Sequence, residues 1–374
     1  MILSQTSRLA APPPFHGSYA AGDVTLLLQP LSLQPIDDLA EKERLIQSGE
    51  RHYSEMISPE RPPSPAYLAL FHQAVADHAP RMARDLVHLA RRIRAVRPDG
   101  VTLVSLARAG TPVGVLLRRL LAELLAVDAP HYSISVIRDR GVDAQALDHI
   151  LARHPAHSLV FIDGWTAKGA ITTTLSSSLA AYGHRRGIQV APELFVLSDL
   201  AGRASGCGST DDYLIPSALL NASVSGLVSR SILNDQIEPG QFHGCLFYAD
   251  WQAHDLSRWF VDRLLAEVRP NRQTWLSEAL PTIDAAGARL RCDTMVHTLC
   301  KRHGLATAHF VKPGIGEATR ALLRRTPSLL LVRNPASAEV RHLVQLAQER
   351  AVPIEADPAL ALQAVALIRS LSDG

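Results

Sequence analysis

Between residues 101 and 199, short apolar runs alternate with segments of helical spacing, and this alternation restricts the fold more than any other feature. The runs are VTLVSLA (101–107), HYSISVI (131–137), SLVFID (158–163) and QVAPELFVLSD (189–199). Strands joined by helices need right-handed crossovers, which give a mostly parallel sheet. Continuous apolar runs indicate strands buried on both faces. We therefore predict an α/β unit with a mostly parallel sheet and flanking helices.

The rest of the chain divides around this unit. Residues 1–20, with three consecutive prolines, are predicted to be a loose N-terminal arm. Residues 21–268 form the larger predicted domain, with further helices at 36–47 and 67–96. A linker is predicted at RPNRQ (269–273), and residues 274–374 form a smaller α/β domain. Its predicted elements are helices at 293–304, 337–351 and 358–371 and strands at 328–334 and 352–356.

Composition excludes several classes of protein. The 374 residues are 47% hydrophobic, which is typical of a globular protein. The net charge is only +2, so the chain as a whole has no strong positive potential that would attract nucleic acid. We expect no signal peptide, because the N-terminus has no compact apolar core behind a basic start. We expect no membrane span, because no apolar run is long enough. The four cysteines, Cys207, Cys245, Cys292 and Cys300, are few and scattered. This pattern favours free thiols in a reducing cytoplasm.

The loop DGWTAKGAIT (163–172) follows an apolar strand and opens a helix. Backbone N–H groups of Lys168, Gly169 and Ala170 would suit a phosphate monoester, and Thr172 could add a hydroxyl. Asp163, at the strand end, could hold sugar hydroxyls or a hydrated magnesium ion. The alternative is a tight turn that binds nothing.

A second loop of the same kind lies one crossover earlier. In SLARAGTPVG (105–114), Arg108 is a planar donor suited to phosphate oxygens, and Gly110 permits an unusual backbone conformation. Two such loops on neighbouring strand ends fit a ligand that is phosphorylated at two places. Arg138 and Arg140, in IRDRG (137–141), would complete the clamp, unless they belong to a solvated turn.

Together, these two loops resemble the pyrophosphate loop and the phosphoribosyl-pyrophosphate (PRPP) motif of type I phosphoribosyltransferases. EKERLIQSGERHYSEMIS, VSLARAGTPVGVLLRR, FIDGWTAKGAIT and IPSALLNASVSGLVSR, in this order, resemble one bacterial branch of that fold. That branch occurs with tellurium-resistance-type stress gene clusters and carries a C-terminal L7Ae/Pelota-like RNA-binding domain.

The resemblance implies a magnesium-dependent transferase that makes a nucleotide-like metabolite from PRPP and a nitrogenous acceptor. Arg108, Ala109 and Gly110 would bind pyrophosphate. Asp163 would contact ribose and magnesium, and Gly164 stands where a second acid is usual. The 5′-phosphate would lie against Lys168, Gly169, Ala170 and Thr172. The alternative is a module that senses PRPP or a nucleotide without turnover.

The C-terminal domain carries KPGIGEATRALLRR (312–325), which resembles the RNA-binding loop of the L7Ae/Pelota fold. The residues expected at RNA are Lys312, Gly314, Glu317, Arg320 and Arg324. The alternative is a domain used for homo-oligomer formation.

Some members of the branch carry a cysteine-protease label, and the sequence keeps that activity as a remote alternative. No local signature joins a cysteine to a base, and Cys207 alone lies in a glycine-rich stretch, GRASGCGSTDDY (202–213). A zinc site is excluded for Cys292 and Cys300 on one helix, because the helical rise separates them by about 12 Å. A buried thiol pair on an apolar face is the preferred interpretation.

Overall fold

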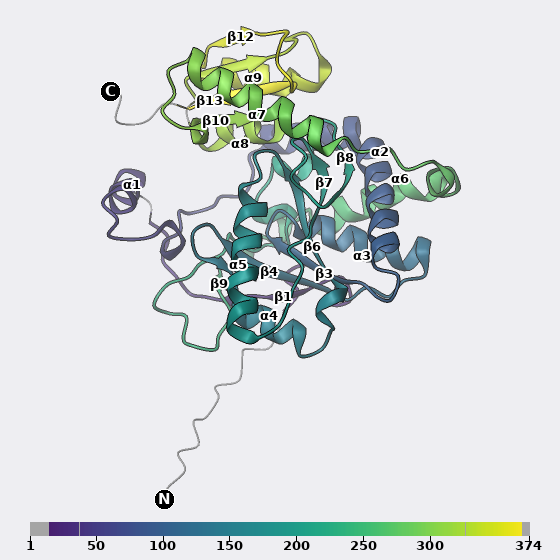
Figure 1. Ribbon diagram of the computed structural model, residues 1–374. Coiled ribbons are helices and arrows are strands. Elements are labelled where there is room, and N and C mark those ends of the chain that lie inside the picture. The colour runs from purple at the N-terminus through teal and green to yellow at the C-terminus, as the bar shows by residue number, and fades with distance from the viewer. Residues whose placement is uncertain (1–14, 37, 326, 369–374) are drawn as a thin grey trace, which may run out of the picture.

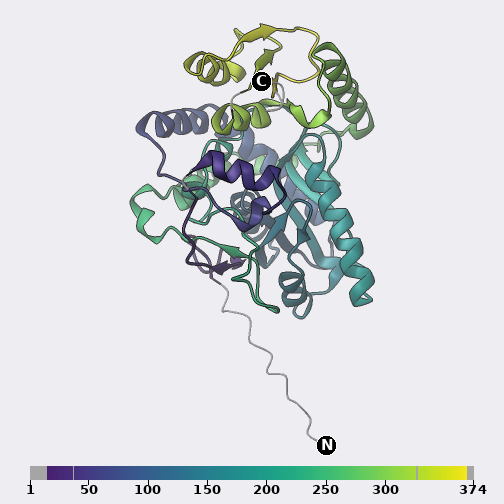
Figure 2. The ribbon, with the colours of Figure 1, turned by 90° about the vertical axis from the view of Figure 1, so that its left-hand side faces the viewer.

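A computed structural model describes residues 15–36, 38–325 and 327–368. The chain forms a larger unit built on a seven-stranded sheet and a smaller unit built on a four-stranded sheet. The smaller unit sits on one edge of the larger one, as the upper part of Figures 1 and 2 shows. Among the described residues, none of the helices is both long and apolar enough to cross a membrane.

The large sheet confirms the predicted α/β class. Its order is β1-β4-β3-β6-β7-β8, every pair on this path is parallel, and the short β5 pairs antiparallel with β4. The strands are β1 (Thr25–Leu27), β3 (Thr102–Ala107), β4 (His131–Ile137), β5 (Gly141–Val142), β6 (Leu159–Thr166), β7 (Leu194–Asp199) and β8 (Gly206–Ser209). Because parallel strands end at one edge, the loops after β3, β4, β6 and β7 share that edge.

Helices cover both faces of this sheet (Figure 1). One buried cluster joins the first face to α2 (Pro65–Val96), α3 (Thr111–Leu125) and α6 (Ser257–Ser277). A second cluster joins the other face to α4 (Ala144–Leu151) and α5 (Ala170–Arg186). Outside these layers lie α1 (Leu39–Gln47) and a small parallel ladder of β2 (Gln29–Pro30) and β9 (Gly244–Cys245). The burial of both faces explains the continuous apolar runs.

Three predictions about the larger unit need correction. The loose arm does not extend to residue 20, because Tyr19 is fully buried and its hydroxyl donates to the Val224 carbonyl; residues 1–14 lie outside the described residues. The predicted linker 269–273 lies inside α6, which continues through Pro270 to Ser277. The glycine-rich stretch 202–213, whose composition predicts a mobile cover or a surface loop, contains the strand β8, in which Cys207 and Gly208 are buried, since its small residues let α2 approach closely.

The smaller unit has a sheet of order β10-β13-β11-β12. Its elements are α7 (Ala285–Arg302), β10 (Val311–Pro313), α8 (Ile315–Arg324), β11 (Leu329–Val332), α9 (Arg341–Glu349), β12 (Ile354–Ala356) and β13 (Ala364–Leu367). The helix predicted at 358–371 is wrong where the chain is described, because β13 forms there. All four residues of β13 are buried between β10 and β11, so an apolar run that suited a helix pairs as a central strand.

Candidate functional site

The two strand-end loops lie side by side, as the sequence predicts. Strands β3 and β6 are parallel neighbours, with Ser105 level with Ile162. A Cβ added to Gly110 would lie 2.4 Å from the Ile162 carbonyl oxygen, so only glycine allows this contact. A Cβ added to Gly164 would lie 3.6 Å from the Ala109 carbonyl oxygen. The backbones of the two loops therefore meet at the carboxyl edge of the sheet.

Arg108, predicted to bind a phosphate group, forms an ion pair with a carboxylate of the same chain. Its Nη1 donates to both oxygens of Glu60, at 2.7 and 2.9 Å, and to the Val228 carbonyl at 3.1 Å. Both side chains are only 14% exposed. Arg108 is therefore neutralised, and an anionic ligand would have to replace Glu60.

Asp163, predicted to bind ribose and magnesium at a strand end, instead lies within β6, which continues to Thr166, and its side chain is half-buried. Burial raises its pKa to about 6, against the hydrogen bond from the Gly164 N–H and the positive charge of Arg320. Within the described residues, no group of three or more His, Cys, Asp or Glu side chains could hold a metal ion. One carboxyl beside an arginine does not fit a magnesium site. Magnesium binding stays a prediction without support from the geometry.

The predicted 5′-phosphate loop turns its lysine toward the smaller unit. The Lys168 ammonium donates to the carbonyls of Ala308 and Val311, at 2.7 and 2.6 Å. Burial, with Lys312 and Arg138 nearby, lowers the pKa of Lys168 to about 8. Gly169 has a φ of +79° and precedes Ala170, the first residue of α5. The Thr172 hydroxyl, on the first turn, is buried without a hydrogen-bond partner in the described part of the chain.

The two arginines of the predicted clamp behave differently. Arg140 forms an ion pair with Glu55. The Arg138 side chain is exposed, and its backbone N–H donates to the Tyr53 hydroxyl at 2.8 Å. Only Arg138 therefore remains available to a ligand.

The loop predicted to contact RNA is partly covered by the larger unit. The N–H of Ile315, next to Gly314, donates to the Asp212 carboxylate at 2.8 Å. A Cβ on Gly314 would lie 2.4 Å from the Leu200 side chain. The Arg320 guanidinium lies 4.4 Å from the centre of the Trp165 ring. Lys312 and Glu317 are half-buried, and the side chain of Arg324 is outside the described residues.

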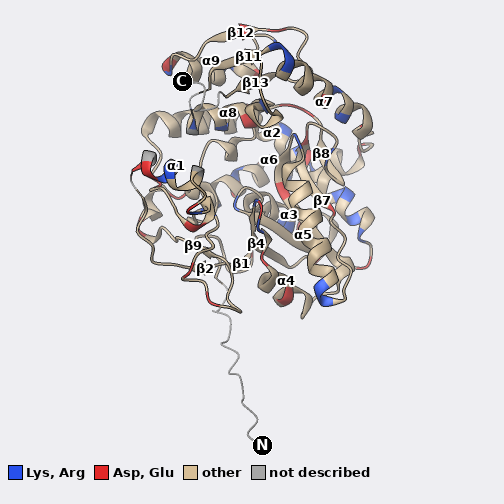
Figure 3. Cartoon of the chain, turned by 60° about the vertical axis from the view of Figure 1, so that its left-hand side comes forward, with Lys and Arg blue, Asp and Glu red and all other residues tan. Residues whose placement is uncertain are grey.

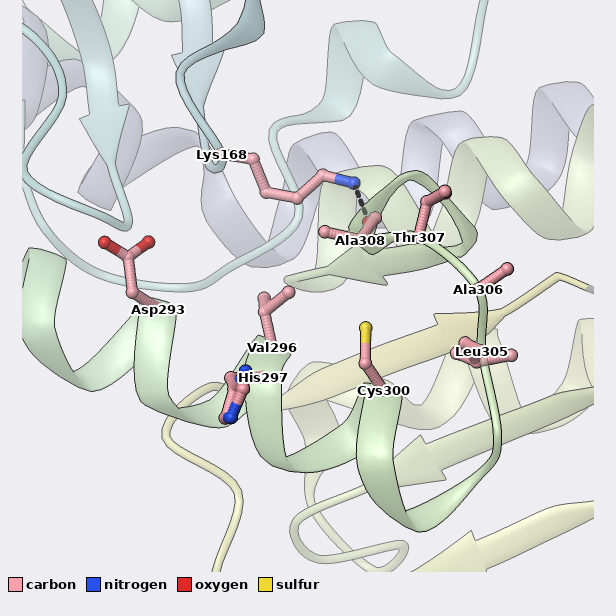
Figure 4. Close-up of a pocket in the computed structure, with 9 residues that line it drawn as sticks. All are labelled: Lys168, Asp293, Val296, His297, Cys300, Leu305, Ala306, Thr307 and Ala308. Carbon is pink, nitrogen blue, oxygen red and sulfur yellow. Dashed lines mark hydrogen bonds between the residues drawn. The ribbon is translucent and has the colours of Figure 1, made fainter.

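A pocket of about 440 Å³ lies where the β6–α5 loop meets the smaller unit (Figure 4). Three of its polar residues, Asp293, His297 and Cys300, come from α7, and Lys168 comes from the larger unit. Its other lining residues are Val296, Leu305, Ala306, Thr307 and Ala308. A thiol, an imidazole, a carboxylate and an ammonium group thus line one cavity.

Cys300 differs from the other three cysteines. Cys207, Cys245 and Cys292 are buried, and burial raises the pKa of each to about 12, 12 and 11. Such thiols are protonated at neutral pH and shielded from solvent, which disfavours them as nucleophiles. Cys300 is partly exposed, and Figure 4 shows its sulfur directed into the pocket.

Sequence reasoning did not identify this group of residues. Asp293, His297 and Cys300 follow the spacing i, i+4, i+7, which places three side chains on one helix face. That spacing is present in the sequence, but without the pocket it gives no sign that the three side chains face a cavity. The predicted buried thiol pair is half right, because Cys292 is buried and Cys300 faces the pocket.

Comparison with known proteins identifies relatives over most of the chain. Residues 17–265 match a family described as tellurite-like stress resistance cysteine protease StiP, and residues 291–370 match the PELOTA RNA binding domain. A protein of Acinetobacter baylyi named cysteine protease StiP is 39% identical over 371 residues, which cover 96% of each chain. A solved structure described as an analysis of an invariant aspartic acid in HPRTs, alanine mutant, is 14% identical. It covers 35% of this chain and 77% of that one, with a TM-score of 0.26, too low to support an argument.

These matches correct the predicted activity. The stress-gene branch and its Pelota-type domain are confirmed. The phosphoribosyltransferase function is wrong as a description of this family, because both the family and its curated relative are named as cysteine proteases. PRPP and a nitrogenous acceptor have no support as partners.

Proposed function

The chain belongs to the StiP family of tellurite-like stress resistance proteins, and we propose that it is a cysteine-dependent peptide hydrolase with Cys300 as the nucleophile. One observation carries the proposal: Asp293, His297 and Cys300 line one pocket from one helix. The names of the family and of the Acinetobacter baylyi relative support a cysteine-dependent peptidase. The assignment to Cys300 rests on the pocket alone, because Cys300 lies outside residues 17–265, in the segment that matches the PELOTA RNA binding domain.

The helix spacing gives each residue a role. Along α7, the helical rise separates Asp293 from His297 by about 6 Å and His297 from Cys300 by about 4.5 Å. Side chains one turn apart lie on one helix face. Among the described residues, no hydrogen bond joins these three side chains to one another, and Asp293 and His297 are exposed, so a side-chain rotation has to bring the imidazole to the thiol. The Asp293 carboxylate accepts two hydrogen bonds from Arg203, at 2.5 and 2.7 Å, which holds it in place.

In this mechanism, His297 takes the proton of the Cys300 thiol, and the thiolate attacks the scissile carbonyl carbon. The imidazolium returns the proton to the leaving amine, and water then hydrolyses the thioester. Lys168 uses two N–H groups on backbone carbonyls, so its third can face the oxyanion. Close contact between the imidazole and the thiol forms as substrate binds.

The test is peptide hydrolysis by the full chain, measured on casein and on a fluorogenic peptide library. We expect Cys300→Ala and His297→Ala to lower kcat/KM by at least about 100-fold. Cys207→Ala, which removes a buried thiol that does not line the pocket, should keep activity. Iodoacetamide should alkylate Cys300 first and inactivate the enzyme in step with alkylation. Full activity of Cys300→Ala would refute this assignment.

We propose RNA binding as a second function, carried by the smaller unit. The match of residues 291–370 to the PELOTA RNA binding domain supports it. Fluorescence anisotropy with a labelled 20-nucleotide RNA tests it, and affinity should fall steeply as salt rises, because phosphate contacts release counterions. An RNA affinity that does not change with salt would contradict binding through phosphates.

We also propose that the protein works in the cytoplasm. Its four cysteines are free thiols, which persist in a reducing compartment. Fractionation of cells that carry the tagged full chain tests this location.

A further inference from the structure

Three basic side chains at the junction of the two units lack an acidic partner. They are Arg138 from the larger unit and Lys312 and Arg325 from the smaller one. In the described part of the chain, none of the three forms a side-chain ion pair or hydrogen bond. Arg140, two residues beyond Arg138, is by contrast paired with Glu55. Figure 3 shows the basic and acidic residues on both units and along this junction.

The order of the large sheet places Arg138 near Lys312 of the smaller unit. Arg138 follows β4, and Lys168 lies in the loop after β6, two strands away in the order β4-β3-β6. Neighbouring strands lie about 4.8 Å apart, so the two loops are about 10 Å apart at the sheet edge. The Lys168 ammonium contacts the carbonyl of Val311, the residue before Lys312, at 2.6 Å. Arg138 therefore lies close to β10 of the smaller unit.

The electrostatics agree with this placement. Burial lowers the pKa of Lys312, Glu317 opposes that effect, and the charges of Arg325 and Arg138 lower the pKa further. Lys168 responds to the charges of Lys312 and Arg138 as well. Lys312 thus lies in the positive field of Arg325 and Arg138, which Glu317 opposes, and a bound anion would stabilise this group of charges.

The loop at residues 314–320, which the sequence predicts to bind RNA, has its donors occupied within the protein. The Ile315 N–H is occupied by Asp212, and Arg320 is stacked on Trp165. The rim that remains open carries Arg138, Lys312 and Arg325, of which Arg138 and Arg325 are exposed.

We propose that RNA phosphates bind across the junction, held by Arg138 of the larger unit together with Lys312 and Arg325 of the smaller one. This inference rests on the proposed RNA binding and adds a site outside the segment that matches the RNA-binding domain. RNA would then contact both units at once, and the pocket of Cys300 and Lys168 would lie close to the bound strand.

The test compares two arginines of the larger unit in the full chain. Arg138→Ala removes the junction charge, and Arg185→Ala removes an exposed charge near the distant end of α5. Binding of the same labelled RNA is measured from 50 to 300 mM KCl. We expect Arg138→Ala to weaken binding three- to tenfold at 100 mM and to lower the salt slope by about 0.7. Arg185→Ala should stay within twofold of the wild type, and Arg138→Lys should restore the salt slope.

Two results would overturn the inference. One would leave the proposed RNA binding intact, and the other would not. If Arg138→Ala behaves like Arg185→Ala while Lys312→Ala and Arg325→Ala weaken binding, RNA uses the smaller unit alone. The proposed RNA function then survives and the composite site does not. If the wild-type chain binds no RNA at any salt concentration, the proposed RNA function and this inference both fail.

Discussion

Among single residues, Glu60 determines what Arg108 can bind. The sequence identified Arg108 as a basic residue at a strand end, and the structure places it there. It did not identify Glu60, which lies 48 residues earlier in a proline-rich loop. Residue type and strand position are local properties, whereas the pairing of two charges depends on how distant loops pack. Arg108 therefore looked available in the sequence and is neutralised in the fold.

The loss of the Glu60 charge should destabilise the larger unit. Glu60→Gln leaves a guanidinium that is 14% exposed without its counter-charge, so we expect the free energy of unfolding to fall by about 3 kcal/mol. Urea denaturation of the full chain measures this change. Glu41→Gln is the matched control, because the pair of Glu41 with Arg44 is on the surface and its loss should have no measurable effect. Equal midpoints for wild type and Glu60→Gln would show that Arg108 does not need its partner.

At the scale of secondary-structure elements, long patterns were predicted well and short apolar runs were not. The alternation of strands and helices between residues 101 and 199 gave the order of elements correctly. The segment of β13 was predicted as a helix, because a short apolar run has no periodicity that separates a buried strand from a helix. The segment becomes a strand because β10 and β11 lie on either side of it and both pair with it. This arrangement exists only in the assembled sheet.

The contact of β3 with β6 allows a test of glycine at the edge of the sheet. Gly110→Ala would place a Cβ 2.4 Å from the Ile162 carbonyl oxygen, a backbone atom that cannot rotate away. The strand ends must therefore separate, and we expect a loss of about 1–3 kcal/mol in the free energy of unfolding. Gly22→Ala is the control, since its Cβ would meet nothing within 4 Å. An unchanged stability of Gly110→Ala would mean that the two loops separate without cost.

Across the whole molecule, the junction between the units contains most of the candidate chemistry. Lys168 reaches two carbonyls of the smaller unit, Arg320 covers Trp165, and Asp212 accepts hydrogen bonds from the backbone N–H groups of Ile315 and Gln363. No periodicity or motif predicts such contacts, because each joins residues more than 100 positions apart. The sequence could predict two units, but it could not predict that the second unit closes over the strand ends of the first.

This closure should depend on pH through Asp212. Burial raises the pKa of Asp212 to about 6, against hydrogen bonds from the Ile315 and Gln363 N–H groups. Once the units separate, the carboxyl regains an ordinary pKa near 3.8. The docked state therefore binds the proton more tightly, so docking should strengthen as pH falls from 7 to 5 and weaken as pH rises through 6.

Hydrogen exchange of the backbone amides of residues 314–319 measures docking, when each rate is divided by that of an unstructured peptide at the same pH. The wild type should show greater protection at pH 5 than at pH 7. In Asp212→Asn the side chain no longer titrates, so this difference should shrink, and Asp163, whose pKa is also about 6 beside Arg320 and Glu317 of the smaller unit, accounts for what remains. Asp85→Asn removes another buried carboxyl of pKa about 6, bonded within the larger unit to Ser209 and Tyr213, and should leave the difference intact. If Asp212→Asn kept the wild-type pH dependence, another group at the junction would control the closure.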